Sequence, residues 1–232
     1  QMGAFLDILE KTNADMVCAD HCCVDHETGQ KKEEKTNVAP CMDVPFSSVC
    51  DQLTVAMHNV TYRTDILQKN NIHLDNCFYT DAEYLLYPIP YVKTVTVAPQ
   101  TIYMYRVSLS TQSMNINSLQ RNCAMHELVL GHLSNAYAAY ESSGAAEPKT
   151  AAFLRRNIAR IAGMQLFIYL TATDSKAAKQ SAKAMMKTIK GKSETLYAEV
   201  NGAKSFKMLT STNFLLFPVL ASMKKREVGA NG

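Results

Sequence analysis

The sequence predicts an α/β protein in which a mixed sheet with flanking helices is followed by an all-helical region. Near the start, apolar residues at helical spacing lead into a short buried strand, the second half of a strand–helix–strand unit. From Ile116 onward, strand patterns stop and helical patterns dominate. The chain has 232 residues, 47% apolar and 19% charged, which is enough to bury a core. We therefore expect one domain at 1–117 and a helical domain at 118–232.

The first domain alternates between helix and strand patterns. Apolar spacing predicts a helix that ends near Asn13, and the ADMVCA segment at 14–19 predicts a buried strand. The charged run at 25–37 predicts a solvated loop or a hairpin turn around Gly29. The other expected elements are a helix at 47–57, a helix at 63–69 capped by Thr61 or Thr64, a short helix at 81–87 ended by Pro88 and Pro90, and strands at 91–97 and 101–107.

The second domain is expected to contain helices only. Ser142-Ser143-Gly144 and Asp174-Ser175 mark loops between them. The expected helices cover 118–142, 148–172, 174–190, 193–200 and 204–225.

Composition narrows the cellular setting. The net charge of +3 is nearly balanced, so we expect no nucleic-acid partner. The seven cysteines are an odd number without regular spacing, which indicates reduced thiols in a cytoplasmic protein. No apolar run reaches the length of about 18 residues that spans a bilayer. Because the chain starts at Gln1, we expect a fragment, a processed chain or an excised domain.

Asp81 and Glu83 form a pair of acids in an aromatic and apolar segment. Two residues apart on a helix, they point to different faces and should not share one task. A helix start favours a negative charge at Asp81, and a carboxylate facing a pocket can act as a general base. The alternative is that Asp81 is only a helix N-cap and Glu83 a surface charge.

A wider set of motifs surrounds this pair. The segments are Tyr62-Arg63-Thr64-Asp65-Ile66-Leu67, Tyr79-Thr80-Asp81-Ala82-Glu83-Tyr84, Tyr103-Met104-Tyr105-Arg106 and Gln112-Ser113. Their order and spacing resemble the acceptor side of inverting, bacterial-type family 2 glycosyltransferases with the GT-A nucleotide-sugar fold. The resemblance implies that Asp81 deprotonates the acceptor hydroxyl and that Glu83 is the second acid. Thr80 departs from the pattern, because many members carry Glu at that position.

The resemblance also implies that the donor-binding half of the enzyme is missing from this chain. Such enzymes begin with a nucleotide-binding segment that ends in a D-x-D motif for Mg²⁺ or Mn²⁺, and this chain contains no D-x-D. The metal ligands of the full-length enzyme are therefore expected outside this chain, which alone should be inactive. The partners implied are a nucleotide-sugar donor and a glycan or lipid-linked acceptor in cell-surface glycan synthesis.

Further residues have a functional and a structural interpretation. His58 and Asn59 precede the Tyr-Arg turn, where the resemblance implies sugar contact; local hydrogen bonds are the alternative. Arg63 either holds a phosphate or pairs with Asp65 or Asp81, and Arg106 either meets a diphosphate or is a surface residue. By resemblance, Gln112 and Ser113 belong to a loop that closes the site.

Two other features complete the sequence predictions. The cluster Cys18, His21, Cys22, Cys23 and His26 lacks the second ligand pair typical of zinc sites, so we expect no metal there. The basic and apolar segment 206–226 either lies on the inner face of a membrane or packs as a helix kinked at Pro218. The rival to the enzyme is a helical interaction module with a small α/β cap and no chemistry.

Overall fold

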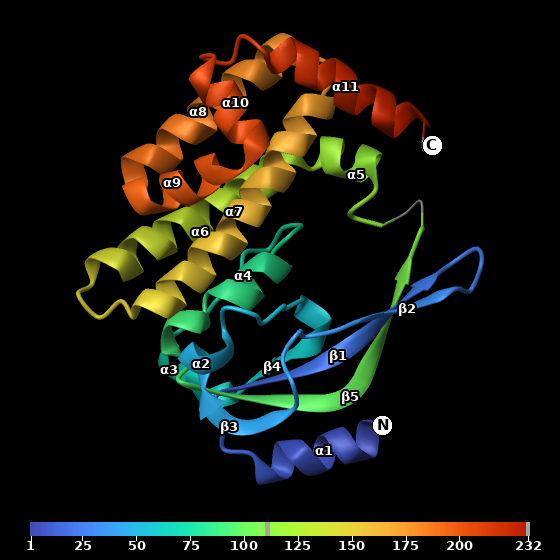
Figure 1. Ribbon diagram of the computed structural model, residues 1–232, viewed down its shortest axis with the longest axis vertical. Coiled ribbons are helices and arrows are strands. Elements are labelled where there is room, and N and C mark those ends of the chain that lie inside the picture. The colour runs from blue at the N-terminus through green and yellow to red at the C-terminus, as the bar shows by residue number, and fades with distance from the viewer. Residues whose placement is uncertain (110–111, 231–232) are drawn as a thin grey trace. The chain divides into compact units, whose positions relative to one another are not determined.

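The computed structural model describes residues 1–109 and 112–230 and is mixed α/β (Figure 1). The chain divides into two compact units. Unit 1 contains Gln1–Asn115 with Ala146–Phe153, and unit 2 contains Ile116–Ala145 with Leu154–Gly232. A general α/β class is therefore confirmed, with strands in the first unit and helices alone in the described part of the second.

Unit 1 is built on a curled five-stranded sheet in the order β2-β1-β5-β3, with β4 also pairing with β1. The parallel pair is β1 with β5, and the other pairs are antiparallel. The strands are β1 (Met16–Asp25), β2 (Lys31–Glu34), β3 (Cys41–Pro45), β4 (Val60–Tyr62) and β5 (Thr94–Val107). The predicted strand at 14–19 is thus the first part of a longer strand, and the hairpin around Gly29 is confirmed.

The predicted strands at 91–97 and 101–107 are one continuous strand, β5. Pro99 lies between the two predicted segments and cannot donate a ladder hydrogen bond. The sheet accommodates Pro99 with an irregularity, since Cys18 pairs with Val97 but Asp20 already pairs with Thr101. Three residues of β5 therefore lie opposite one residue of β1, and pairing resumes beyond them.

Helix α1 (Met2–Lys11) covers one face of the sheet (Figure 1). Its Phe5 packs with Val17, Ala19 and Ala98 in a buried cluster. This core exists because the apolar residues of α1 recur at helical spacing and those of β1 and β5 reach the same face.

Short helices connect the strands of unit 1. They are α2 (Phe46–Val49), η1 (Met57–Asn59), α3 (Thr64–Lys69), α4 (Asp81–Leu86) and η2 (Ile89–Tyr91). The predictions of α3 and α4 are confirmed. The predicted helix at 47–57 is wrong beyond Val49, because Leu53 is buried and the Thr54 amide bonds to the Thr36 carbonyl at 2.9 Å. The prediction that a threonine caps α3 is also wrong, since Arg63 occupies the cap position and makes no capping hydrogen bond with its side chain.

Unit 2 consists of helices. They are α5 (Ile116–Arg121), α6 (Cys123–Ser142), α7 (Pro148–Thr171, whose first turn belongs to unit 1), α8 (Ser175–Lys192), α9 (Glu194–Gly202), α10 (Lys204–Ser211) and α11 (Phe217–Ala230). The single helix predicted at 204–225 is wrong. It breaks between α10 and α11, where Asn213 and Phe214 have φ angles of 48° and 61°, and Pro218 lies in the first turn of α11.

Polar side chains link the helices of unit 2. The Tyr137 hydroxyl lies 3.1 Å from Glu141, 3.0 Å from the Thr195 hydroxyl and 2.8 Å from the Arg155 guanidinium, which donates to it. Asp174 caps α8 by accepting from two amides of its first turn. Among the described residues, none of the helices combines the length and apolarity needed to cross a bilayer.

Candidate functional site

Helix α4 separates the two acids of the sequence motif. Asp81 is its first helical residue and is exposed, whereas Glu83 is fully buried. Thr80 occupies the cap position and no side chain caps the helix, so the interpretation of Asp81 as an N-cap is wrong. The interpretation of Glu83 as a surface charge is wrong as well. The different environments follow from the two-residue spacing, which turns the side chains to different faces.

Glu83 anchors α4 to the loop before it. Its carboxylate accepts from the Asp75 amide at 2.9 Å and from the Tyr87 hydroxyl at 3.0 Å. Burial and the bond to Glu83 together raise the pKa of Tyr87 well above its ordinary value. A buried carboxylate is stable only when such donors compensate for its lost hydration. Whether Glu83 also meets a substrate stays a prediction.

Four rings from three elements of unit 1 form what we call the imidazole–tyrosine cluster: His21 of β1, His58 of η1, and Tyr103 and Tyr105 of β5. The His58 ring stacks on both tyrosines, with centroids 5.0 Å from Tyr103 and 4.8 Å from Tyr105. His21 meets His58 edge-on at 4.2 Å. The tyrosines share a face because they are two residues apart on a strand, and β1 pairs His21 with Tyr103.

Burial keeps both histidines of the cluster neutral. It lowers the pKa of His58 to about 4, with a smaller contribution from the neighbouring His21, which would repel a second positive charge. Burial also lowers the pKa of His21, against the opposing effect of Glu34 and Asp20. Within the described residues, Nδ1 of His21 and Nε2 of His58 are buried without a hydrogen-bond partner. These atoms can therefore bond to a molecule that reaches them.

The cluster opens to solvent. Burial raises the pKa of Tyr105, and the negative charge of Asp81 raises it further. Tyr103 is 46% exposed. The carboxylate of Asp81 is exposed, and an exposed carboxylate can take a proton from a bound hydroxyl.

The loop after β5 is tied to the segment that leads into Asp81. The Tyr79 hydroxyl donates to the Ser113 carbonyl at 3.1 Å, and Tyr79 has a φ of 72°, which is unusual for a bulky residue. Gln112 accepts from the Leu109 amide at 3.3 Å and donates to the Arg106 carbonyl. The backbone of Arg106 is held in this way while its side chain is exposed. The structure therefore brings Gln112 and Ser113 to the Asp81 side.

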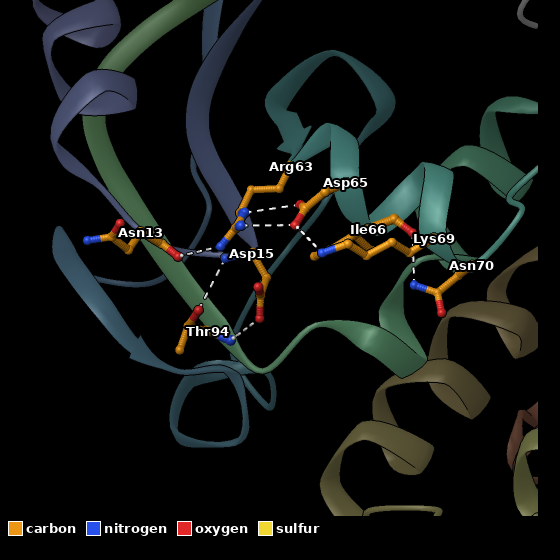
Figure 2. A network of polar contacts seen from close by, with 8 residues as sticks. All are labelled: Asn13, Asp15, Arg63, Asp65, Ile66, Lys69, Asn70 and Thr94. Carbon is orange, nitrogen blue, oxygen red and sulfur yellow. Dashed lines mark hydrogen bonds and ion pairs between the residues drawn. The ribbon is translucent and has the colours of Figure 1, made fainter.

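Arg63 belongs to a structural network, shown in Figure 2. Its guanidinium bonds to both Asp65 oxygens, at 3.2 and 3.0 Å, and to the Asn13 carbonyl at 3.4 Å. Asp15 continues the network by accepting from the amides of Lys93 and Thr94, which joins the start of β1 to that of β5. The interpretation of Arg63 as an ion-pair partner of Asp65 is confirmed.

The side chain of Asn59 makes a local hydrogen bond. Its side chain is buried, and its Oδ1 accepts from the Ala56 amide at 2.7 Å, which shapes η1 and so places His58. The interpretation of Asn59 as a maker of local hydrogen bonds is confirmed. His58, in contrast, is part of the imidazole–tyrosine cluster rather than a loop residue with local bonds only.

Sequence reasoning missed His21 as a site residue, although it lies in the Cys/His cluster considered for zinc. The TIYMYRV segment at 101–107 carried a usable signal, because its alternation places two tyrosines on one face. Nothing local in the sequence indicated that β1 would bring His21 to them.

No protein-family model matches the chain, and a search of curated proteins returned no match.

Proposed function

We propose that this chain supplies the acceptor side of an inverting glycosyltransferase, with Asp81 as the general base. The observation that carries the proposal is the exposed carboxylate of Asp81 at the start of α4, whose charge acts on Tyr105 of the solvent-open imidazole–tyrosine cluster. Glu83, the neighbouring acid, is occupied in holding α4. The site therefore offers one carboxylate for chemistry and one for positioning.

The reaction uses these groups in a single displacement. Asp81 takes the proton of an acceptor hydroxyl while the hydroxyl oxygen bonds to the anomeric carbon of the donor sugar. The bond from that carbon to the nucleoside diphosphate breaks, and the diphosphate leaves with the electron pair. Attack from the face opposite the leaving group inverts the anomeric configuration. The exposed ring of Tyr103 suits a sugar acceptor, because the apolar faces of sugar rings pack on aromatic side chains.

We place the metal that such enzymes use on another segment. The sequence contains no D-x-D, and the acids of β1 have partners within the chain. Asp20 accepts from the Thr36 amide at 3.0 Å and pairs with Lys35 at 3.0 Å, and Asp25 accepts from the Ser108 hydroxyl. We therefore assign no step in this chain to a metal, and donor binding falls to another segment.

The test is a transfer assay on the longest natural form of the protein. It is incubated with nucleoside-diphosphate sugars, Mg²⁺ or Mn²⁺ and hydroxyl acceptors, and the released nucleoside diphosphate is measured. Asp81→Asn is expected to lower kcat by about 10²- to 10⁴-fold, the usual contribution of a general base. Asp7→Asn, an exposed acid on α1, is the matched control and should keep full activity.

Three results would refute the proposal. One is an Asp81→Asn protein that folds and keeps more than about a tenth of the activity. The second is a product with retained anomeric configuration by NMR. The third is a natural protein with no nucleotide-binding segment ending in D-x-D ahead of residue 1, which would favour the interaction module instead.

A further inference from the structure

Helix α8 carries a row of lysines along one side. Its members are spaced i, i+3, i+7, i+11 and i+14, which places them on one face of a helix: Lys176, Lys179, Lys183, Lys187 and Lys190. The opposite face is buried through Ala178, Ala182, Met185, Met186 and Ile189. No acidic residue lies within α8. The helix thus presents a continuous positive edge to solvent.

A second row, of apolar side chains, follows the turn after α10 and continues along α11. Leu215, Val219 and Met223 are four residues apart and are 74%, 56% and 55% exposed. Phe214 and Phe217 are buried beside them and fix the segment in unit 2. Exposed apolar side chains at regular spacing are costly in water unless a partner covers them.

The two rows belong to one surface, which we call the α8–α11 surface. Lys183 Nζ lies 5.9 Å from the centroid of the Phe214 ring, next to Leu215. Lys225 Nζ of α11 donates to the Ser175 hydroxyl at the start of α8, at 3.1 Å. A cleft of about 390 Å³ separates the two helices there and is lined by Ser175, Pro218, Ala221, Ser222, Lys225 and Arg226. Figure 1 shows α8, α10 and α11 gathered in unit 2.

Much of the positive charge on this surface is not neutralised within the chain. Lys190 faces Glu194 at 3.9 Å and Lys224 faces Glu227 at 2.6 Å. Among the described residues, Lys176, Lys179 and Lys187 have no acidic partner within ion-pair distance. From Lys204 to Arg226 the sequence holds only basic charges.

We propose that the α8–α11 surface docks on the face of an anionic lipid bilayer. The lysines and Arg226 meet the anionic headgroups, and Leu215, Val219 and Met223 enter the boundary between headgroups and acyl chains. The choice of a bilayer over a nucleic acid rests on the apolar row, because phosphate backbones attract lysines but do not cover aliphatic side chains. This inference does not depend on the proposed transfer reaction.

The experiment measures cosedimentation of the 232-residue chain with sucrose-loaded vesicles. Vesicles of phosphatidylcholine are compared with vesicles that also contain phosphatidylglycerol. We expect binding to the anionic vesicles only, and a large loss of binding in 1 M salt, where the Debye length falls to about 3 Å. Free glycerophosphoglycerol should not compete, because it offers no interface for the apolar row.

Two triple variants separate the contributions. Lys176→Gln, Lys179→Gln and Lys187→Gln together should weaken binding on the order of a hundredfold, since each lysine near an anionic surface contributes about fivefold. Leu215→Gln, Val219→Gln and Met223→Gln should weaken it about tenfold or more. The matched control removes the same charge from exposed positions of unit 1, through Lys11→Gln, Lys31→Gln and Lys93→Gln, and should bind normally. Circular dichroism confirms that each variant is folded.

The proposal is overturned if the wild-type chain fails to bind anionic vesicles or binds neutral ones equally well. It is also overturned if the unit 1 control loses as much affinity as the α8 variant, or if the folded apolar variant binds normally. A third outcome also overturns the proposal. If an RNA oligonucleotide displaces the wild-type chain from vesicles, and the apolar variant still binds that RNA, the surface is assigned to nucleic acid.

Discussion

The titration of His58 offers the sharpest test of the imidazole–tyrosine cluster. Burial lowers the pKa of this histidine from 6.5 to about 4 in the folded chain. Between these two pH values the unfolded chain binds a proton that the folded chain does not. The contribution of His58 to the free energy of unfolding is therefore complete above pH 6.5. It falls as the pH drops from 6.5 to about 4, and it levels off at lower pH.

The size of this effect follows from the two pKa values. The displacement from 6.5 to about 4 corresponds to about 3.4 kcal/mol, at about 1.36 kcal/mol for each pH unit. The ring of His58 is only half-buried, so solvent screening reduces the effect, and we expect about 1.5–2 kcal/mol. His21 also lowers the free energy of unfolding on acidification, because burial lowers its pKa too.

The assay is urea unfolding followed by circular dichroism between pH 7.5 and pH 4. His58→Phe keeps a flat ring against Tyr103 and Tyr105 but carries no proton, so its loss of stability on acidification should be smaller by about 1.5–2 kcal/mol. The difference between the two proteins removes the contribution of carboxylates that titrate in the same pH range, because both proteins carry them. His73→Phe, at an exposed position, is the control and should follow the wild-type profile. The reasoning fails if the profiles of wild type and His58→Phe are parallel, or if NMR shows the His58 imidazole titrating near 6.5.

Two further substitutions test how the chain holds its helices. Glu83→Gln should lower the free energy of unfolding by about 1–3 kcal/mol, because an amide group then faces the Asp75 amide or the Tyr87 hydroxyl as a second donor. Urea unfolding against Glu10→Gln, an exposed control, measures this loss, and a change below about 0.5 kcal/mol would contradict it. Asp174→Ala should cost about 1 kcal/mol by uncapping α8, whereas Asp174→Ser should cost much less. Hydrogen exchange in the first turn of α8 distinguishes the two, and equal exchange in both variants would count against the cap.

Local sequence patterns predicted the elements whose causes are local. The turn at Gly29 needs a φ of +70°, which glycine adopts without steric cost, and the hairpin forms there. Helix α4 ends before Pro88, as expected from the effect of proline on the preceding residue. Helix α8 begins directly after Asp174, at the loop expected there.

Predictions went wrong where distant residues decide the conformation. The helix expected at 47–57 stops at Val49 because the chain turns to bury Leu53 and to bond Thr54 to Thr36. The two strands expected at 91–97 and 101–107 are one strand because β1 pairs with both parts. In each case a long-range contact outweighed a propensity that amounts to about 1 kcal/mol or less per residue.

The sequence by itself determined that Asp81 and Glu83 would face different surroundings, because a two-residue step on a helix turns side chains apart. Only the tertiary structure decided which acid is buried, through the Asp75 amide and the Tyr87 hydroxyl that receive Glu83. It alone also brought His21 to His58 and the two tyrosines of β5. The reason is physical: helix geometry acts over a few residues, whereas strand pairing joins atoms that are far apart along the chain.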